Sequence, residues 1–292
     1  MFYYSDLIAE IDEFRRRNVE VGSIGNSELG QEIPYIFTGN KLGKKIIITG
    51  AIHAREHITA LLTICLCKDL IKQQKSCGVY FIPMVNPDGV RLATEGKLFL
   101  DSLGIDKKKY VDKVLKINNS NDFSLWKANI NGVDLNVNFD ASWGSGKQNV
   151  FYARMSDYVG KAPNDQAETK ALINFTKSVM PSAVIAYHCK GEEIYWNFKQ
   201  SGGQLWRDYT FARRISRITG YSISDRRGSA GGYKDWCIDK LKIPSLTIEV
   251  GEDKHEHPFP YAEFKSIYEK NKKVVDETIA FVENRIDEKK QN

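Results

Sequence analysis

The sequence predicts an α/β fold in which helices cover both faces of a largely parallel sheet. Short apolar runs typical of buried strands alternate with longer stretches of helical periodicity. Residues 45–85 supply the clearest unit, a strand, a helix and a second strand, and this order implies parallel pairing. The 292 residues are 42% apolar and no linker or repeat divides them, so we expect one domain over residues 1–292.

The expected elements begin with an amphipathic helix at residues 5–18, which opens with a polar cap. The others are strands 45–49 and 78–85 around helix 59–73, then helix 165–180, strand 182–187, helix 205–219, strand 245–250 and helix 262–288. The segment 86–89, Asn-Pro-Asp-Gly, reads first as a turn, with a role in shaping a cleft as the alternative. Sites in such folds form at the carboxyl ends of strands.

Composition argues against several classes of partner. The net charge of +5 comes from 42 basic and 37 acidic residues, and the short lysine runs lack interleaved aromatics, so we expect no nucleic-acid binding. No apolar stretch approaches the roughly 20 residues of a membrane span. The five cysteines show no disulfide spacing and the first residues show no export signal, which predicts a cytoplasmic protein.

A histidine and a glutamate follow the first strand at a spacing that suits a shared metal ion. His53 and Glu56 come directly after the apolar run 46–50, and His188 ends the strand 182–187. Two histidines, one carboxylate and a position left for water are typical of catalytic zinc, whereas cysteines commonly close structural sites. We therefore expect one Zn2+ per chain, bound by His53, Glu56 and His188, in a metallohydrolase.

Other histidines offer alternative metal sites. His53, Glu56 and His57 also match the inverted zincin pattern, but that pattern requires a helix, and here the motif follows a strand. His57 is then a packing or pocket residue. His255 and His257 stand in a polar segment that reads as an exposed loop, with a second metal site as the alternative.

Two carboxylates are candidates for supporting roles. Glu249 interrupts the apolar strand 245–250, where a carboxylate is costly unless it is paired or faces a cleft. It is either a solvated strand residue or a general base that takes a proton from a metal-activated water. Asp134 is a candidate partner for the second nitrogen of a zinc-binding imidazole, which normally donates to a carboxylate or carbonyl.

The whole chain resembles the zinc carboxypeptidase superfamily, which includes the pancreatic carboxypeptidases. Five fragments match in family order, at residues 50–56, 86–89, 132–136, 187–188 and 246–249. The resemblance implies that His53, Glu56 and His188 bind zinc, that Glu249 is the base and that Asp134 supports His53. It also implies a single domain with a mixed sheet of about eight strands between helices.

Three departures from the digestive members of that family bear on specificity. Val137 follows Asn136 where those members have an arginine that binds the substrate's terminal carboxylate, and a valine cannot pair with a carboxylate. Ile238 is taken to replace their mobile tyrosine. Lys127 replaces an arginine that polarises the scissile carbonyl. A lysine keeps the charge and can stabilise an oxyanion, with an exposed surface lysine as the alternative.

The departures favour a branch, the bacterial γ-D-glutamyl-L-diamino acid endopeptidases, which the segments 126–129, 188–196 and 231–236 resemble. The resemblance implies hydrolysis of the γ-D-glutamyl–diaminopimelate bond of murein peptides. The alternatives are a metallocarboxypeptidase acting on ordinary L-peptides and a non-catalytic zinc-containing protein that binds murein peptides. The oligomeric state stays open. Expected substrate contacts are Asn136, Arg55 and Arg154, with Glu192, Glu193, Arg226 and Arg227 as further candidates by position.

Overall fold

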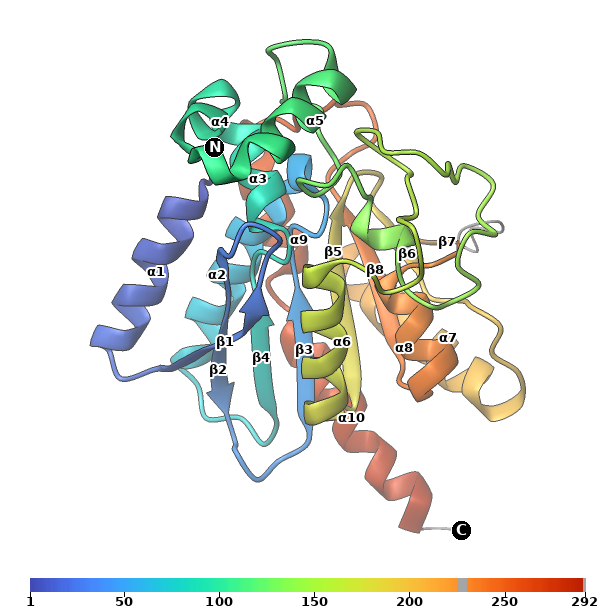
Figure 1. Cartoon of the computed structure of the whole chain (residues 1–292). Coiled ribbons are helices and arrows are strands. Elements are labelled where there is room, and N and C mark those ends of the chain that lie inside the picture. The colour runs from blue at the N-terminus through green and yellow to red at the C-terminus, as the bar shows by residue number, and fades with distance from the viewer. Residues whose placement is uncertain (225–229, 291–292) are drawn as a thin grey trace.

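A computed structural model describes residues 1–224 and 230–290, the last six of them as backbone alone. Within these ranges eight strands form one sheet in the order β1-β2-β4-β3-β5-β8-β6-β7 (Figure 1). The strands are β1 (Glu20–Asn26), β2 (Glu32–Gly39), β3 (Lys45–Thr49), β4 (Gly78–Ile82), β5 (Ala183–Cys189), β6 (Glu193–Tyr195), β7 (Ser222–Ser224) and β8 (Ser245–Val250). The central strands β4, β3, β5 and β8 run parallel, whereas β1, β2 and β6 join through antiparallel pairs. The mixed sheet with a parallel centre confirms the predicted fold class.

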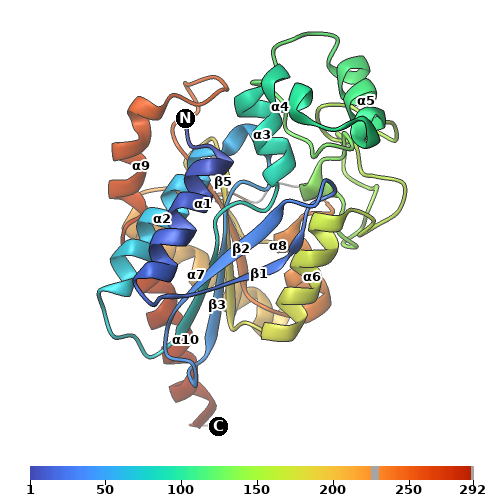
Figure 2. The ribbon, with the colours of Figure 1, turned by 60° about the vertical axis from the view of Figure 1, so that its left-hand side comes forward.

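Helices pack on both faces of this sheet and complete three layers (Figure 2). They are α1 (Tyr4–Arg16), α2 (Ile58–Ile71), α3 (Pro87–Glu95), α4 (Lys97–Ser102), α5 (Lys108–Asn118), α6 (Ala167–Val179), α7 (Gly202–Thr219), α8 (Tyr233–Leu241), α9 (Phe264–Asn271) and α10 (Val274–Lys290). One apolar cluster joins α1, α2, α7 and α10 to Ile46 and Ile48, and a second joins α6 and α8 to Ile47. Successive strand side chains point to opposite faces, so the isoleucine run of β3 supplies both cores.

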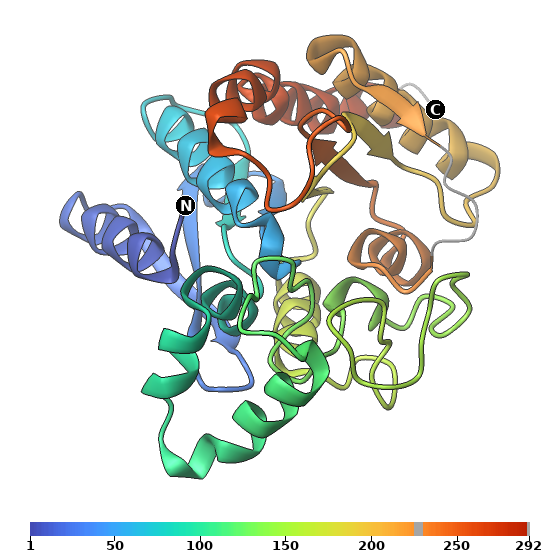
Figure 3. The same cartoon turned by 90° about the horizontal axis from the view of Figure 1, so that it is seen from above.

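The carboxyl ends of β3, β5 and β8 lie beside one another because these strands are parallel neighbours. Figure 3 views the molecule from above, where the long connection between α5 and α6 lies beside this end of the sheet. Polar residues that follow or end these strands are therefore brought to a common edge, as expected for this class of fold.

Several elements differ from the sequence-based expectation. Residues 86–89 are not a free turn, because Asn86 caps α3 by accepting from the Gly89 amide at 3.0 Å, and Pro87 occupies the first helical position. The closing helix is two helices, α9 and α10, with a break at residues 272–273. The hairpin of β1 and β2 was not predicted. Across the described ranges, no helix has both the length and the apolarity that a membrane crossing requires.

Candidate active site

His53 and Glu56 reach the sheet edge because the chain turns sharply after β3. A Cβ atom on Gly50 would lie 2.8 Å from the carbonyl oxygens of Pro83 and Thr59, so only glycine fits where the chain leaves the strand. A short 3-10 turn at Ala54–Glu56 then directs the Glu56 side chain back towards His53. His188 comes from the neighbouring strand β5.

The donor atoms of these three side chains converge in a buried corner. His53 Nδ1 lies 2.8 Å from Glu56 Oε1 and 3.1 Å from His188 Nδ1, and His188 Nδ1 lies 3.2 Å from Glu56 Oε2. Tetrahedral zinc with ligand bonds of about 2.0–2.1 Å would place its ligands about 3.3 Å apart, close to these separations. Two imidazole nitrogens and a carboxylate that converge this closely direct their lone pairs to one common point. This donor set therefore fits a metal cation.

Further groups fix the orientation of the three side chains. His53 Nε2 lies 3.2 Å from Asp134 Oδ1, and the other oxygen of Asp134 lies 2.7 Å from Lys127 Nζ. The Cys189 amide donates to Glu56 Oε2 at 3.1 Å. Lys127 Nζ is also 3.6 Å from Asp157 Oδ1. Asp134 therefore occupies the predicted position beside His53, and Lys127 contacts that carboxylate.

The charges in this corner stabilise one another. Burial raises the pKa of Glu56, but the imidazoles of His53 and His188 outweigh this effect and hold the pKa well below its usual range. Burial likewise opposes ionisation of Asp134, yet Lys127 and His53 hold its pKa well below the ordinary value. Burial lowers the pKa of Lys127 and the two neighbouring aspartates raise it, with a net increase. Both carboxylates are thus ionised at neutral pH, and for Glu56 this is the form that a metal ligand requires.

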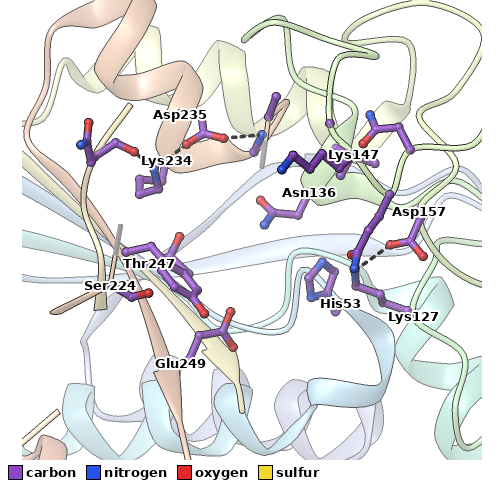
Figure 4. A pocket seen from close by; sticks show the side chains of 18 residues that line it. His53, Lys127, Asn136, Lys147, Asp157, Ser224, Lys234, Asp235, Thr247 and Glu249 are labelled. Carbon is purple, nitrogen blue, oxygen red and sulfur yellow. Dashed lines mark hydrogen bonds and ion pairs between the residues drawn. The ribbon is translucent and has the colours of Figure 1, made fainter. Parts of the chain in front are cut away.

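Glu249 lies on β8, the strand next to β5. It pairs in register with His188, and because paired residues of parallel strands project to the same face, the carboxylate stands beside the metal ligands. Glu249 lines the same cavity as His53 and Lys127 (Figure 4). Glu249 is half-buried in this position.

The cavity has a volume of about 420 Å3 and extends from the metal-binding corner towards α8. It is lined by His53, Lys127, Asn136, Val137, Gly146, Lys147, Gln148, Asn149, Asp157, Tyr195, Asn197, Ser224, Ala230, Gly232, Lys234, Asp235, Thr247 and Glu249. Asn136 lies at its wall as expected, and its Oδ1 accepts from the Tyr233 amide at 3.0 Å. Arg55 and Arg154 are not among the described lining residues, and Arg226 and Arg227 lie outside the described ranges.

The remaining histidines do not join the metal corner. His57 Nδ1 lies 2.6 Å from the Tyr261 hydroxyl, which makes His57 the packing residue that the sequence favoured over a ligand. His255 Nε2 is 3.7 Å from Glu263 Oε1. In the part of the chain that the structure describes, His53, Glu56 and His188 form the only cluster able to hold a metal ion. A second site at His255 and His257 is not found there.

Sequence reasoning missed part of the cavity wall. Lys234 and Asp235 stand on α8 opposite the metal-binding corner (Figure 4), and no role was assigned to them. Two adjacent opposite charges between Tyr233 and Trp236, in a segment that is otherwise apolar, were the available signal. Ile238, expected to replace a mobile tyrosine, is instead buried in α8 and does not reach the cavity.

Comparison with known proteins identifies the family of the chain. The sequence profile described as zinc carboxypeptidase matches residues 4–274. Gamma-D-glutamyl-L-diamino acid endopeptidase 1 of Lysinibacillus sphaericus is 36% identical over 263 residues, which are 84% of this chain and 63% of that relative. The chain thus spans somewhat under two thirds of this relative's length.

Solved structures show the same fold. Bovine thrombin-activatable fibrinolysis inhibitor, in complex with a tick carboxypeptidase inhibitor, has a TM-score of 0.79 at 18% identity and covers 97% of both chains. Murein-tripeptide amidase MpaA of Escherichia coli O157 has a TM-score of 0.53 at 19% identity and covers 90% of this chain and 91% of its own. The profile match and the zinc-fitting cluster of His53, Glu56 and His188 lead to one conclusion: the protein belongs to the zinc carboxypeptidase family.

Proposed function

We propose that this protein hydrolyses the γ-D-glutamyl–diaminopimelate bond of murein peptides. The observation that carries the proposal is the placement of Glu249 and the zinc-binding cluster along one cavity. The choice of bond is supported by the 36% identity to an endopeptidase whose name specifies γ-D-glutamyl and L-diamino acid groups. It is also supported by Val137, which lies at the cavity wall and cannot pair with a free terminal carboxylate.

Glu249 acts as the general base and then as the acid in this proposal. Zinc, when bound, polarises the scissile carbonyl and lowers the pKa of water. The Glu249 carboxylate accepts the proton of the attacking water and delivers it to the leaving amine, since it lines the cavity next to His188. Its half-buried position limits hydration of the carboxylate and so favours proton transfer.

Lys127 stabilises the charge that develops on the carbonyl oxygen. Its ammonium stands at the cavity wall, and Asp134 at 2.7 Å and Asp157 at 3.6 Å fix its position. Because these contacts exist before substrate arrives, little reorganisation is needed when the oxyanion forms. Asp134 has a second task, since it also orients His53.

Replacing Glu249 tests this mechanism. Glu249→Gln should retain zinc and lower kcat on a γ-D-glutamyl–diaminopimelate peptide by about a thousandfold, since it removes the base and leaves the ligands in place. Glu252→Gln, which changes a nearby carboxylate paired with Lys254, should keep normal turnover. Near-normal turnover by zinc-loaded Glu249→Gln would reject the mechanism.

The wild-type protein should be assayed on a defined murein tripeptide and tetrapeptide and on ordinary L-peptides with free or blocked C-termini. Cleavage of the γ-D-glutamyl bond supports the proposal. Removal of a C-terminal residue from L-peptides alone would assign carboxypeptidase activity instead. Tight binding of murein peptide by the zinc-loaded protein without cleavage would assign a binding function.

A further inference from the structure

The wall of the cavity opposite the metal-binding corner carries a buried pair of opposite charges. Lys234 and Asp235 form the start of α8, and Figure 4 shows them across the cavity from His53 and Lys127. Lys234 is the one lysine among the described residues that is buried, with 7% of the residue exposed, yet both Lys234 and Asp235 line the cavity. This wall therefore presents a fixed cation and a fixed anion to any ligand.

The contacts of Lys234 leave part of its donor capacity for a ligand. Its Nζ donates to the Asn197 carbonyl at 3.1 Å and to Asp235 Oδ1 at 2.5 Å. An ammonium carries three N–H donors, so one stays available on the cavity side. Asp235 Oδ2 accepts from the Gly232 amide at 3.2 Å, and the carboxylate keeps further lone pairs.

Fold stability gives little reason for this arrangement. A buried ion pair commonly contributes no more to stability than well-packed apolar side chains of similar volume, because both charges lose hydration. Tyr233 and Trp236, on either side of the pair, are buried in an apolar cluster. A hydrophobic residue at position 234 would be compatible with that setting, so the pair has a better explanation in ligand recognition.

The other lysines among the described lining residues lie beside the metal-binding corner or are exposed. Lys127 is held by Asp134 and Asp157 in the metal-binding corner, and Lys147 is exposed on the loop between α5 and α6. Val137 supplies no charge. Among the described lining residues, Lys234 is thus the buried cation placed to meet a carboxylate away from the reacting bond.

We propose that Lys234 and Asp235 recognise the far, zwitterionic end of a diamino acid that carries a second carboxylate, as diaminopimelate does. Lys234 binds that carboxylate and Asp235 faces the neighbouring ammonium. A lysine at the same peptide position has the ammonium but lacks the carboxylate, and it leaves the Lys234 donor unpaired. The pair therefore selects diaminopimelate peptides over lysine peptides. This inference rests on the proposed function, because it specifies the substrate of the same cavity.

The test compares two peptides that differ at one residue, γ-D-glutamyl–meso-diaminopimelate and γ-D-glutamyl–L-lysine. The wild-type protein should favour the former in kcat/KM. Lys234→Met should lose about 10–100-fold on the diaminopimelate peptide, the range for a hydrogen bond to a charged group, and change little on the lysine peptide. Lys234→Arg should recover part of the preference. Lys240→Met, at a more exposed lysine on the same helix, should behave as wild type.

Several outcomes would overturn the inference. One is an equal loss on both peptides in zinc-loaded Lys234→Met with an unchanged melting temperature, and another is a wild-type protein without preference. If Lys234→Met does not fold, Lys234→Gln replaces it, since its amide can still donate to the Asn197 carbonyl. If the wild-type protein cleaves neither peptide, the proposed function is rejected, and the inference about Lys234 needs its own test. Calorimetric binding of free meso-diaminopimelate and L-lysine to wild type and Lys234→Gln then decides the inference separately.

Discussion

Two pairs of buried carboxylates in this chain have pKa values shifted in opposite directions. Glu56 and Asp134 in the metal-binding corner are 3% and 0% exposed, and Asp88 and Glu168 at the junction of α3 and α6 are both 0% exposed. The first pair has pKa values well below the ordinary range. Burial, with a contribution from neighbouring carboxylates, raises the pKa of Asp88 to about 6 and that of Glu168 to about 8. Similar burial therefore does not determine whether the pKa of a carboxylate rises or falls.

The groups around each carboxylate determine the direction of its pKa shift. Burial disfavours the ionised form in all four groups, but the first pair faces two imidazoles and the Lys127 ammonium. The second pair faces itself and Glu28, and its hydrogen bonds come from neutral donors such as the Leu29 amide at 2.8 Å. The first pair therefore carries its charge beside the metal ligands. The second pair joins the turn after β1 to two helices, and within it Glu168 is largely neutral at pH 7 whereas Asp88 ionises against the effect of burial.

Removing an imidazole from the ionised pair should have the largest effect. His188→Ala deletes a zinc ligand and leaves Glu56 without one of its two imidazole partners. We expect loss of bound zinc and a fall in activity of at least about a thousandfold. Metal analysis and peptide turnover measure both, with His255→Ala as the control outside the metal-binding corner. Full zinc content in His188→Ala would show that the ligand set is wrong.

Removing the ammonium from the same pair should have a smaller effect. Lys127→Met leaves Asp134 with His53 alone among its close charged partners, which weakens the support of a zinc ligand. We expect zinc affinity or kcat to fall by about 10–100-fold. Zinc titration and turnover at one pH report the two quantities, and Lys161→Met serves as a surface control. Unchanged zinc affinity and unchanged kcat would show that Asp134 supports His53 without the Lys127 ammonium.

Neutralising the second pair should stabilise the protein. The folded pKa of Glu168 lies above its unfolded value, so the stability associated with its protonated form is present in acid. That stability is lost as pH rises from about 4.5 to about 8. Glu168→Gln should raise the free energy of unfolding by roughly 3 kcal/mol at pH 7 and by almost nothing at pH 4. Denaturant unfolding at both pH values checks this difference, and Glu168→Gln that destabilises equally at both would contradict it.

The smallest effect is expected at Asp88. Its pKa is raised less than that of Glu168, and one of its oxygens accepts from the Leu29 amide while the other has no hydrogen-bond partner. Asp88→Asn keeps an acceptor for that amide and should stabilise by roughly 2–3 kcal/mol at pH 7, somewhat less than Glu168→Gln, with no gain at pH 3. The same unfolding curves measure it. A gain larger than that of Glu168→Gln would reverse the assigned order of the two groups.

Much of the centre of the fold could be predicted because its signals are local. The apolar runs of β3, β5 and β8 mark buried strands, and His53, His188 and Glu249 stand at or near their ends, so parallel pairing brings them together. The hairpin of β1 and β2 escaped prediction because β1 is largely half-buried without an apolar run, and the apolar run of β2 contains Pro34, a residue that argues against a strand. Asn86 and Pro87 were taken for a turn although the same residues also begin helices.

The far cavity wall could not be predicted for a different reason. Asn197, Ser224 and Lys234 come from separate segments whose meeting depends on how β6, β7 and α8 pack. No spacing along the chain encodes that contact. Lys127 was expected from a resemblance, but its 2.7 Å contact with Asp134 follows only from the path of the long connection before α6.

The hydrogen bond from the Cys189 amide to Glu56 Oε2 has a consequence for mutational tolerance. Because the donor is a main-chain amide, every residue except proline supplies it. Substitutions at position 189 therefore leave this hydrogen bond intact. The thiol of Cys189 is buried and its pKa is raised by burial, so it plays no ionised part there. The side chain at the end of β5 can therefore change to suit packing, while Glu56 keeps its hydrogen bond from the amide of residue 189.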